Sequence, residues 1–130
     1  MSLQGVMRCP CRKKSETRSY GACCQPFHKG EKVALSAEAL MRSRYAAFAF
    51  GDAAYLAATW HSSTRPVTIE FNPGQMWLML RIIAASTDGD AATVEFSAKS
   101  RIGTDSFMLH EVSRFVREDG RWFYVDGDTR

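Results

Sequence analysis

Residues 107–117 read FMLHEVSRFVR, and this stretch decides the fold. Turn signals bound it on both sides, with Gly103 before it and the sequence Glu118-Asp119-Gly120 after it, which predicts a long strand that reverses into a second strand at residues 121–126. One face would carry Phe107, Leu109, Glu111, Ser113 and Phe115, and the other Met108, His110, Val112, Arg114 and Val116.

Further strands are expected on the N-terminal side of this stretch. Val94, Phe96 and Ala98 alternate with polar residues, as in a half-buried strand. The sequence Asp88-Gly89-Asp90 before them is a hairpin signal. Residues 77–85 are apolar and could form a buried strand or a helical turn that leads into one, and residues 67–71 have strand character.

Two helices are predicted before the strands. Ser36 is a good N-cap, and an apolar stripe at spacings of three and four leads to Gly51, which suits a left-handed helix end. This stripe consists of Leu40, Met41, Arg44, Tyr45 and Phe48. Asp52 can cap a second helix that ends near Trp60. Helices followed by an antiparallel meander indicate the α+β class.

All four cysteines of the chain lie in one short segment, as Cys9, Cys11, Cys23 and Cys24. A bridge between the adjacent Cys23 and Cys24 would be strained, since neighbouring Cα atoms are only about 3.8 Å apart. Cross-paired disulfides need an oxidising compartment, whereas residues 1–8 do not resemble a secretory signal and favour a cytoplasmic location. Four thiolates therefore predict a closed structural Zn²⁺ site, with iron as an alternative ion. His28 is a replacement ligand if one cysteine does not reach the metal.

Composition is that of an ordinary soluble domain. The chain has 130 residues, with 45% hydrophobic and 24% charged residues, and no apolar run long enough for a membrane span. Residues 1–32 carry seven basic and two acidic side chains, against ten basic and twelve acidic in the remainder. This basic end favours a weakly bound polyanion such as ribosomal RNA, unless it is merely a solvated loop.

Two stretches carry a resemblance to known families. Cys-x-Cys followed by Cys-Cys resembles the SEC-C zinc motif of the SecA translocase, with a spacer of eleven residues instead of eight and with Arg12-Lys13-Lys14 in place of Gly-Ser-Gly. Residues 40–50, 59–66, 109–115 and 118–126 are similar to the uncharacterised bacterial YchJ-like family. The resemblance implies a SEC-C-like zinc knuckle at residues 1–30. It also implies a domain like nuclear transport factor 2 at 31–130, with a strongly bent, cone-shaped antiparallel sheet packed on the helices.

Two functions follow from these expectations. The first is a zinc-binding adaptor, monomeric or homodimeric, whose basic knuckle contacts a protein or ribosomal partner, in line with the export and ribosome associations of the SEC-C motif. The second is a small-molecule binder or an isomerase-like or dehydratase-like enzyme that uses the cone, so that enzymatic activity is left open.

The candidate residues for the second function depend on which strand face is turned inward. The catalytic candidates are Glu111, His110 and His61, and the pocket candidates are Trp60, Trp77 and Trp122. Glu111 could instead pair with Arg42, Arg44 or Arg65 and be only structural.

Overall fold

Short helices precede four long strands in the computed structural model, which describes residues 3–12 and 16–130. The helical elements are η1 (Leu3–Val6), η2 (Tyr20–Ala22), α1 (Gln25–His28), α2 (Ala37–Phe50) and α3 (Ala53–Ala58). The strands are β1 (Gln75–Asp88), β2 (Ala91–Ile102), β3 (Asp105–Glu118) and β4 (Arg121–Thr129). This order confirms the predicted α+β class.

The four strands form one antiparallel meander in the order β1-β2-β3-β4. The sheet curls because the register shifts between Trp77 and Met79 and between Ile82 and Ala84 in β1, and again after Arg114 in β3. The strongly bent sheet expected from the resemblance is therefore confirmed. Residues 77–85 belong to strand β1 and do not form a helical turn.

The two predicted helices are confirmed together with their caps. The side chain of Ser36 accepts a hydrogen bond from the backbone N–H of Ala39, and Gly51 ends α2 with a φ of 73°. Asp52 caps α3 by accepting from the N–H of Tyr55. No helix in the described part of the chain has the length and apolar character needed to cross a membrane.

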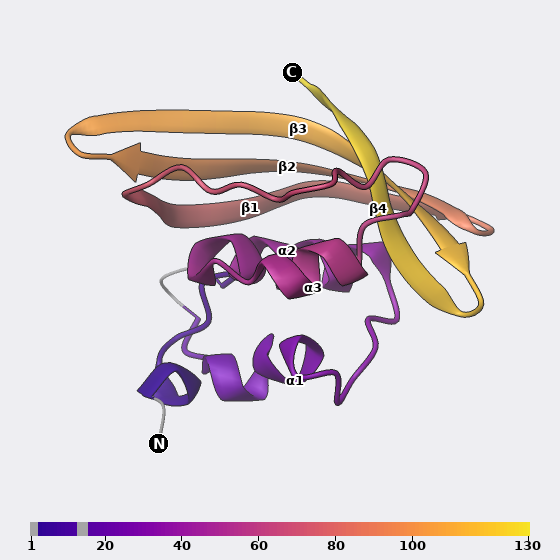
Figure 1. Ribbon diagram of the computed structural model, residues 1–130, viewed down its shortest axis with the longest axis horizontal. Coiled ribbons are helices and arrows are strands. Elements are labelled where there is room, and N and C mark those ends of the chain that lie inside the picture. Colours follow the sequence, from indigo (N-terminus) through magenta and orange to yellow (C-terminus); the bar gives the residue numbers. More distant parts are fainter. Residues whose placement is uncertain (1–2, 13–15) are drawn as a thin grey trace.

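Helix α2 lies between the sheet and the N-terminal segment, as Figure 1 shows, so that sheet, helices and cysteine knuckle form successive layers. The concave sheet face and α2 enclose the main core. Its largest buried apolar side chains include Leu40, Leu80, Val94, Phe96, Phe115 and Trp122. The cysteines and Tyr20 pack against the opposite side of the helix and belong to the same buried cluster.

The strand character predicted for residues 67–71 is wrong. Residues 61–74 contain neither helix nor strand, and they run beside β1 in Figure 1. Val67 is fully exposed, whereas Phe71 packs edge-on against Phe48 at 6.3 Å. Phe71 therefore anchors this segment on α2, and the apolar side chains do not form one face of a strand.

Candidate metal centre and internal cavity

Backbone pairing of two short segments brings the cysteines together. Arg8 and Ser19 form an isolated antiparallel bridge, and the N–H of Cys9 donates to the carbonyl oxygen of Arg18 at 2.9 Å. The 3-10 helix η2 then turns the chain so that Cys23 returns to the first pair. The eleven-residue spacer is thus closed by its own hydrogen bonds, and the additional length does not separate the two cysteine pairs.

The four sulfur atoms have the spacing of a tetrahedral metal site. All four Sγ atoms lie within 4.8 Å of one another, and all four side chains are buried. The Sγ–Sγ distances are 3.7 Å for Cys9–Cys11, 3.5 Å for Cys11–Cys23, 3.6 Å for Cys11–Cys24 and 3.9 Å for Cys23–Cys24. Zn–S bonds of about 2.3 Å give a tetrahedron with edges of about 3.8 Å. The donor set therefore fits a single metal ion.

Arg12 occupies the position at which the related motif has a glycine. Its backbone N–H donates to the carbonyl oxygen of Cys9 at 3.1 Å, and its Nε donates to the sulfur of Cys23 at 3.3 Å. The guanidinium thus supports the cluster in place of a glycine turn. Lys13 and Lys14, the other two residues at these positions, lie outside the described residues.

Hydrogen bonds among the thiols raise the pKa of some cysteines and lower the pKa of others. Hydrogen bonds from Cys11 and Cys24 lower the pKa of the Cys23 thiol. The pKa of Cys11 is raised by its hydrogen bond with Cys23, and that of Cys24 by its hydrogen bond with Cys11. The cluster therefore retains protons in the absence of a cation, and metal binding must release them.

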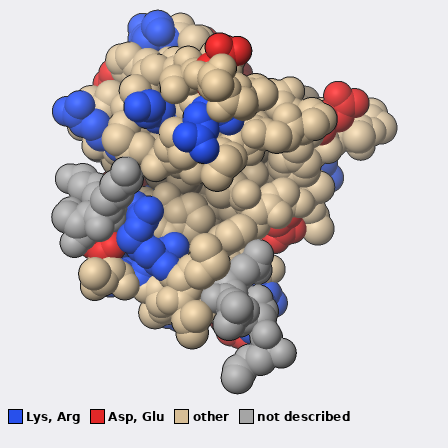
Figure 2. All heavy atoms as spheres, turned by 90° about the vertical axis from the view of Figure 1, so that its left-hand side faces the viewer, with Lys and Arg blue, Asp and Glu red and all other residues tan. Residues whose placement is uncertain are grey.

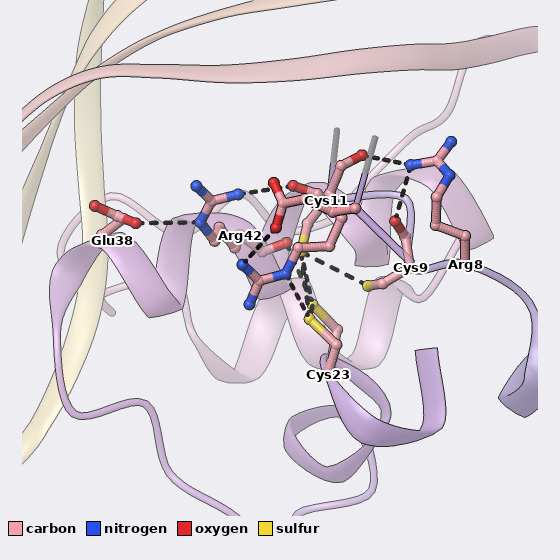
Figure 3. A network of polar contacts seen from close by, with 9 residues as sticks. Arg8, Cys9, Cys11, Cys23, Glu38 and Arg42 are labelled. Carbon is pink, nitrogen blue, oxygen red and sulfur yellow. Dashed lines mark hydrogen bonds and ion pairs between the residues drawn. The ribbon is translucent and has the colours of Figure 1, made fainter. Parts of the chain in front are cut away.

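Helix α2 holds the knuckle through Arg42, which Figure 3 shows beside Cys11. Its Nη1 donates to the carbonyl oxygen of Cys11 at 2.7 Å, and its Nε pairs with Glu38 at 3.2 Å. The sulfur of Cys24 in turn contacts the carbonyl oxygen of Arg42 at 3.7 Å. The metal centre is thus attached directly to α2.

His28, considered above as a replacement ligand, forms a second attachment between the knuckle and α2. Its Nδ1 lies 2.5 Å from the hydroxyl of Tyr20, and its Nε2 lies 2.7 Å from the carbonyl oxygen of Ser43 in α2. The ring also packs against Tyr55 with centroids 4.7 Å apart. Both ring nitrogens are engaged away from the sulfur cluster, so His28 connects the knuckle to α2 and is not a ligand in this arrangement.

A partly open hollow of about 230 Å³, called the internal cavity below, lies between α2 and the concave face of the sheet. Its wall contains two of the three pocket tryptophans, Trp60 and Trp77, together with Glu111. The other lining residues are Met41, Arg44, Tyr45, Phe48, Phe96, Ala98, Leu109, Ser113 and Tyr124. The cavity is therefore mostly apolar and aromatic, with one carboxylate and one guanidinium.

Glu111 reaches this cavity because the face of β3 that carries it is turned inward. Its Oε2 accepts a hydrogen bond from the hydroxyl of Ser113 at 2.8 Å. Gly127 on β4 makes room for the carboxylate, since a Cβ atom there would lie 2.5 Å from that oxygen. Glu111 forms no ion pair within 4.0 Å among the described residues, so the expected partnership with an arginine is absent from this part of the chain.

Arg44, which the sequence analysis named only as one possible partner of Glu111 and as part of the apolar stripe of α2, lies in the cavity wall. It is only 3% exposed. Its Nη1 donates to the carbonyl oxygen of Leu56 and the hydroxyl of Thr59, and its guanidinium lies over the rings of Trp60 and Tyr124. Burial lowers the pKa of Arg44 to about 10, so the side chain remains a cation at neutral pH. The sequence signal that could have identified Arg44 is a charged residue within an otherwise apolar helix stripe.

The two histidine candidates lie outside the cavity wall. His110 is on the outer sheet face, where its Nε2 contacts Glu95 at 2.7 Å. His61 follows α3, with its Nε2 2.8 Å from Glu118 and its Nδ1 2.6 Å from the hydroxyl of Ser63. This Ser-His-Glu arrangement lies outside both the internal cavity and the hollow that Trp122 lines.

Trp122, the third pocket candidate, lines a different hollow of about 380 Å³ on the outside of the cone. That hollow lies between the segment that follows α1, helix α3 and the start of β4. Lys29, Lys32 and Arg121 are on its rim, against a single carboxylate from Asp52. The outer hollow is therefore basic, whereas the internal cavity is apolar.

Comparisons with known proteins agree with this arrangement. The family described as "YchJ, middle NTF2-like domain" matches residues 36–127. A UPF0225 protein from Cupriavidus metallidurans is 47% identical over 133 aligned positions, which cover 97% of this chain and 92% of that protein. One from Deinococcus radiodurans is 49% identical, with 91% and 86% covered.

Two solved structures have the same fold over nearly the whole chain. A SEC-C motif containing protein from Rhodopseudomonas palustris is 34% identical, with a TM-score of 0.81 and coverage of 95% of this chain and 99% of that one. Another from Psychrobacter arcticus is 26% identical, with a TM-score of 0.81 and coverage of 96% and 84%. The knuckle and the cone thus occur together in other SEC-C motif containing proteins.

Proposed function

This chain belongs to the YchJ family, and from that premise we propose that it is a zinc-binding adaptor whose basic side contacts ribosomal RNA. The proposal has two parts. One concerns the ion that the cysteine cluster holds, and the other concerns the partner that the knuckle side of the molecule meets.

The cysteine cluster suits Zn²⁺ in a structural role. Four thiolates complete a tetrahedron around the ion, and sulfur separations of 3.5 to 3.9 Å match that geometry. A closed Cys₄ site has no position for a water nucleophile, so the ion would stabilise the fold and not perform a reaction. The SEC-C motif of both solved relatives supports the same role.

The attachment of the knuckle to α2 is the observation that carries the adaptor role. Arg42 bonds to the backbone of Cys11, and His28 bonds to the backbone of Ser43, so the knuckle is held at two points. A surface fixed in this way loses little conformational entropy on binding, unlike a flexible tail. The knuckle and the adjoining part of the cone can therefore present one preformed surface.

The proposal assigns the contact with the partner to the cations beside the outer hollow. Arg8 donates to the carbonyl oxygens of Cys9 and Arg12, and Arg12 itself supports Cys23, so these two arginines serve the knuckle. Lys29 and Lys32 project at the other side of the knuckle, next to Arg121 of the cone. Phe27 and Phe123 line the same hollow, and cations interleaved with aromatic rings suit a nucleic acid strand.

Lysine and arginine side chains also gather elsewhere on the molecule. Figure 2 shows them on both the sheet layer and the knuckle layer at the end opposite the outer hollow. A general attraction to polyanions would involve both ends, whereas the adaptor proposal assigns the contact to the outer hollow. Variants at the two places can therefore be compared directly.

The test is co-sedimentation of the purified protein with ribosomes at several salt concentrations. The variant Lys29→Glu/Lys32→Glu should reduce the bound fraction about tenfold or more and flatten its salt dependence, since phosphate contacts release counterions. The control Arg81→Glu/Lys99→Glu makes the same change of charge at exposed residues of β1 and β2. Equal losses in both variants, or no loss in either, would overturn the assignment.

Metal analysis tests the zinc part separately. Protein purified without added metal should contain about one zinc per chain, and Cys11→Ser should lose most of it. Iron in place of zinc, or a metal-free protein with an ordered knuckle, would contradict this part of the proposal.

A further inference from the structure

Arg44 and Glu111 face the same internal cavity from α2 and β3 without pairing to each other. Neither takes part in an ion pair within 4.0 Å in the described ranges 3–12 and 16–130. A charge in apolar surroundings is costly unless it is paired and hydrogen-bonded. The cavity wall therefore contains one positive and one negative group, whose nitrogen and oxygen atoms are more than 4.0 Å apart.

The guanidinium of Arg44 has unused donors. A guanidinium offers five N–H groups, and Nη1 supplies both hydrogen bonds that the structure records for Arg44, to Leu56 and Thr59. Nε and Nη2 bond to no described residue. These donors lie in a planar fork, which matches a carboxylate that binds through both oxygens.

The carboxylate of Glu111 also has an unused oxygen. Ser113 donates to Oε2, whereas Oε1 has no hydrogen-bond partner among the described residues. Gly127 leaves the room in which this side chain lies, because any Cβ atom there would overlap with the carboxylate. A hydrogen-bond donor with a positive charge, such as an ammonium group, would complete the bonding of Glu111.

The walls between the two charges define the remainder of the ligand. Phe48, Trp77, Phe96 and Leu109 provide apolar and aromatic surface. The indole Nε1 of Trp60 is buried without a hydrogen-bond partner in the described part of the chain. At about 230 Å³, the cavity is smaller than the 300 to 1,000 Å³ of sites for drug-sized ligands, so it suits a small metabolite.

From this arrangement we propose that the internal cavity binds a small zwitterion, an amino acid with an apolar side chain. Its carboxylate pairs with Arg44, its ammonium group with Glu111, and its side chain packs against Trp77. This role is independent of the zinc knuckle and goes beyond the adaptor function, because the cavity lies on the other side of α2.

The test uses the indole N–H signals of the tryptophans in the full-length, metal-loaded, ¹⁵N-labelled protein. L-Phenylalanine is the probe, and it should shift the Trp60 and Trp77 signals in a saturable manner. Trp122 lines the outer hollow, so its signal should not move and serves as an internal control. Unmoved Trp60 and Trp77 signals throughout a titration into the millimolar range would overturn the proposal.

Two further probes and one variant assign the charged groups. In Glu111→Gln, the affinity for L-phenylalanine should fall about tenfold or more, whereas 3-phenylpropionate, which lacks the ammonium group, should bind both proteins equally. Wild-type protein should bind 2-phenylethylamine, which lacks the carboxylate, at least about tenfold more weakly than L-phenylalanine. Equal affinity of L-phenylalanine for wild type and Glu111→Gln would reject the assigned pairing, and this variant avoids the risk that an Arg44 variant does not fold.

Discussion

The Nη1 atom of Arg42 lies 2.7 Å from the carbonyl oxygen of Cys11 and joins helix α2 to the cysteine cluster. The two residues are far apart in the sequence. Arg42 also forms an ion pair with Glu38 on its own helix. The backbone that positions one sulfur ligand is therefore fixed by a side chain of α2. Metal binding and the stability of this helix should depend on each other.

Removal of Arg42 should weaken this connection. Arg42→Ala leaves the carbonyl oxygen of Cys11 without its charged donor, and hydrogen bonds of this kind contribute about 1.5–3 kcal/mol. We expect the metal-loaded protein to lose about 1–2 kcal/mol of unfolding free energy, measured by urea denaturation, and to bind zinc more weakly. The control Arg81→Ala, at an exposed position, should change stability by less than about 0.5 kcal/mol. Equal values for the two variants would contradict the connection.

Metal removal should affect the layers of the molecule in a fixed order. Structural zinc contributes an apparent binding free energy of about 10–16 kcal/mol, so chelation should remove hydrogen-exchange protection from the knuckle first. The side of α2 that carries Arg42 and Ser43 should follow, since both residues hold the knuckle. The amides of β2 and β3 should stay protected, because their residues supply no ligand. Loss of protection in the sheet at the same chelator concentration would show that the layers unfold together.

Local signals explain why much of the fold could be predicted from the sequence. Ser36, Gly51 and Asp52 mark helix ends through bonds to residues close in the chain, and all three have their expected roles. The bend of the sheet was expected only through the family resemblance. It depends on register shifts such as that between Trp77 and Met79, which arise from pairing with a distant strand. No local sequence pattern predicts such a register shift.

The candidate sites also differ in how far the sequence could predict them. The cysteine cluster could be predicted because its ligands are close in the sequence and their chemistry is specific. The orientation of Glu111 could not, because a shift of one residue exchanges the two faces of a strand. Arg44 was named only as a possible partner of Glu111, and Gly127 was not named, since their contacts lie across α3 and between β3 and β4.

Alkaline pH should destabilise the fold through Tyr124. Burial is the main cause that raises the pKa of this phenol from 10 to about 12 in the folded protein. Between these values the unfolded chain has lost the proton that the folded chain retains, so stability falls as the pH rises from 10 to 12. The loss should approach roughly 2 kcal/mol at pH 12 relative to pH 9. Tyr124→Phe should remove this part of the pH dependence in denaturation curves, and parallel curves for both proteins would exclude the phenol as its source.

Gly127 should tolerate a side chain only when Glu111 is shortened. A Cβ atom at Gly127 would lie 2.5 Å from Oε2 and 2.8 Å from Cδ of Glu111, so Gly127→Ala must displace the carboxylate and disturb its hydrogen bond with Ser113. We expect a loss of about 1–2 kcal/mol of unfolding free energy, in the range of overpacking substitutions. In a Glu111→Ala background the same substitution should cost less than about 0.5 kcal/mol, because the clashing atoms are gone. A double-mutant cycle by urea denaturation measures this coupling, and strictly additive effects would show that the two residues do not compete for the same space.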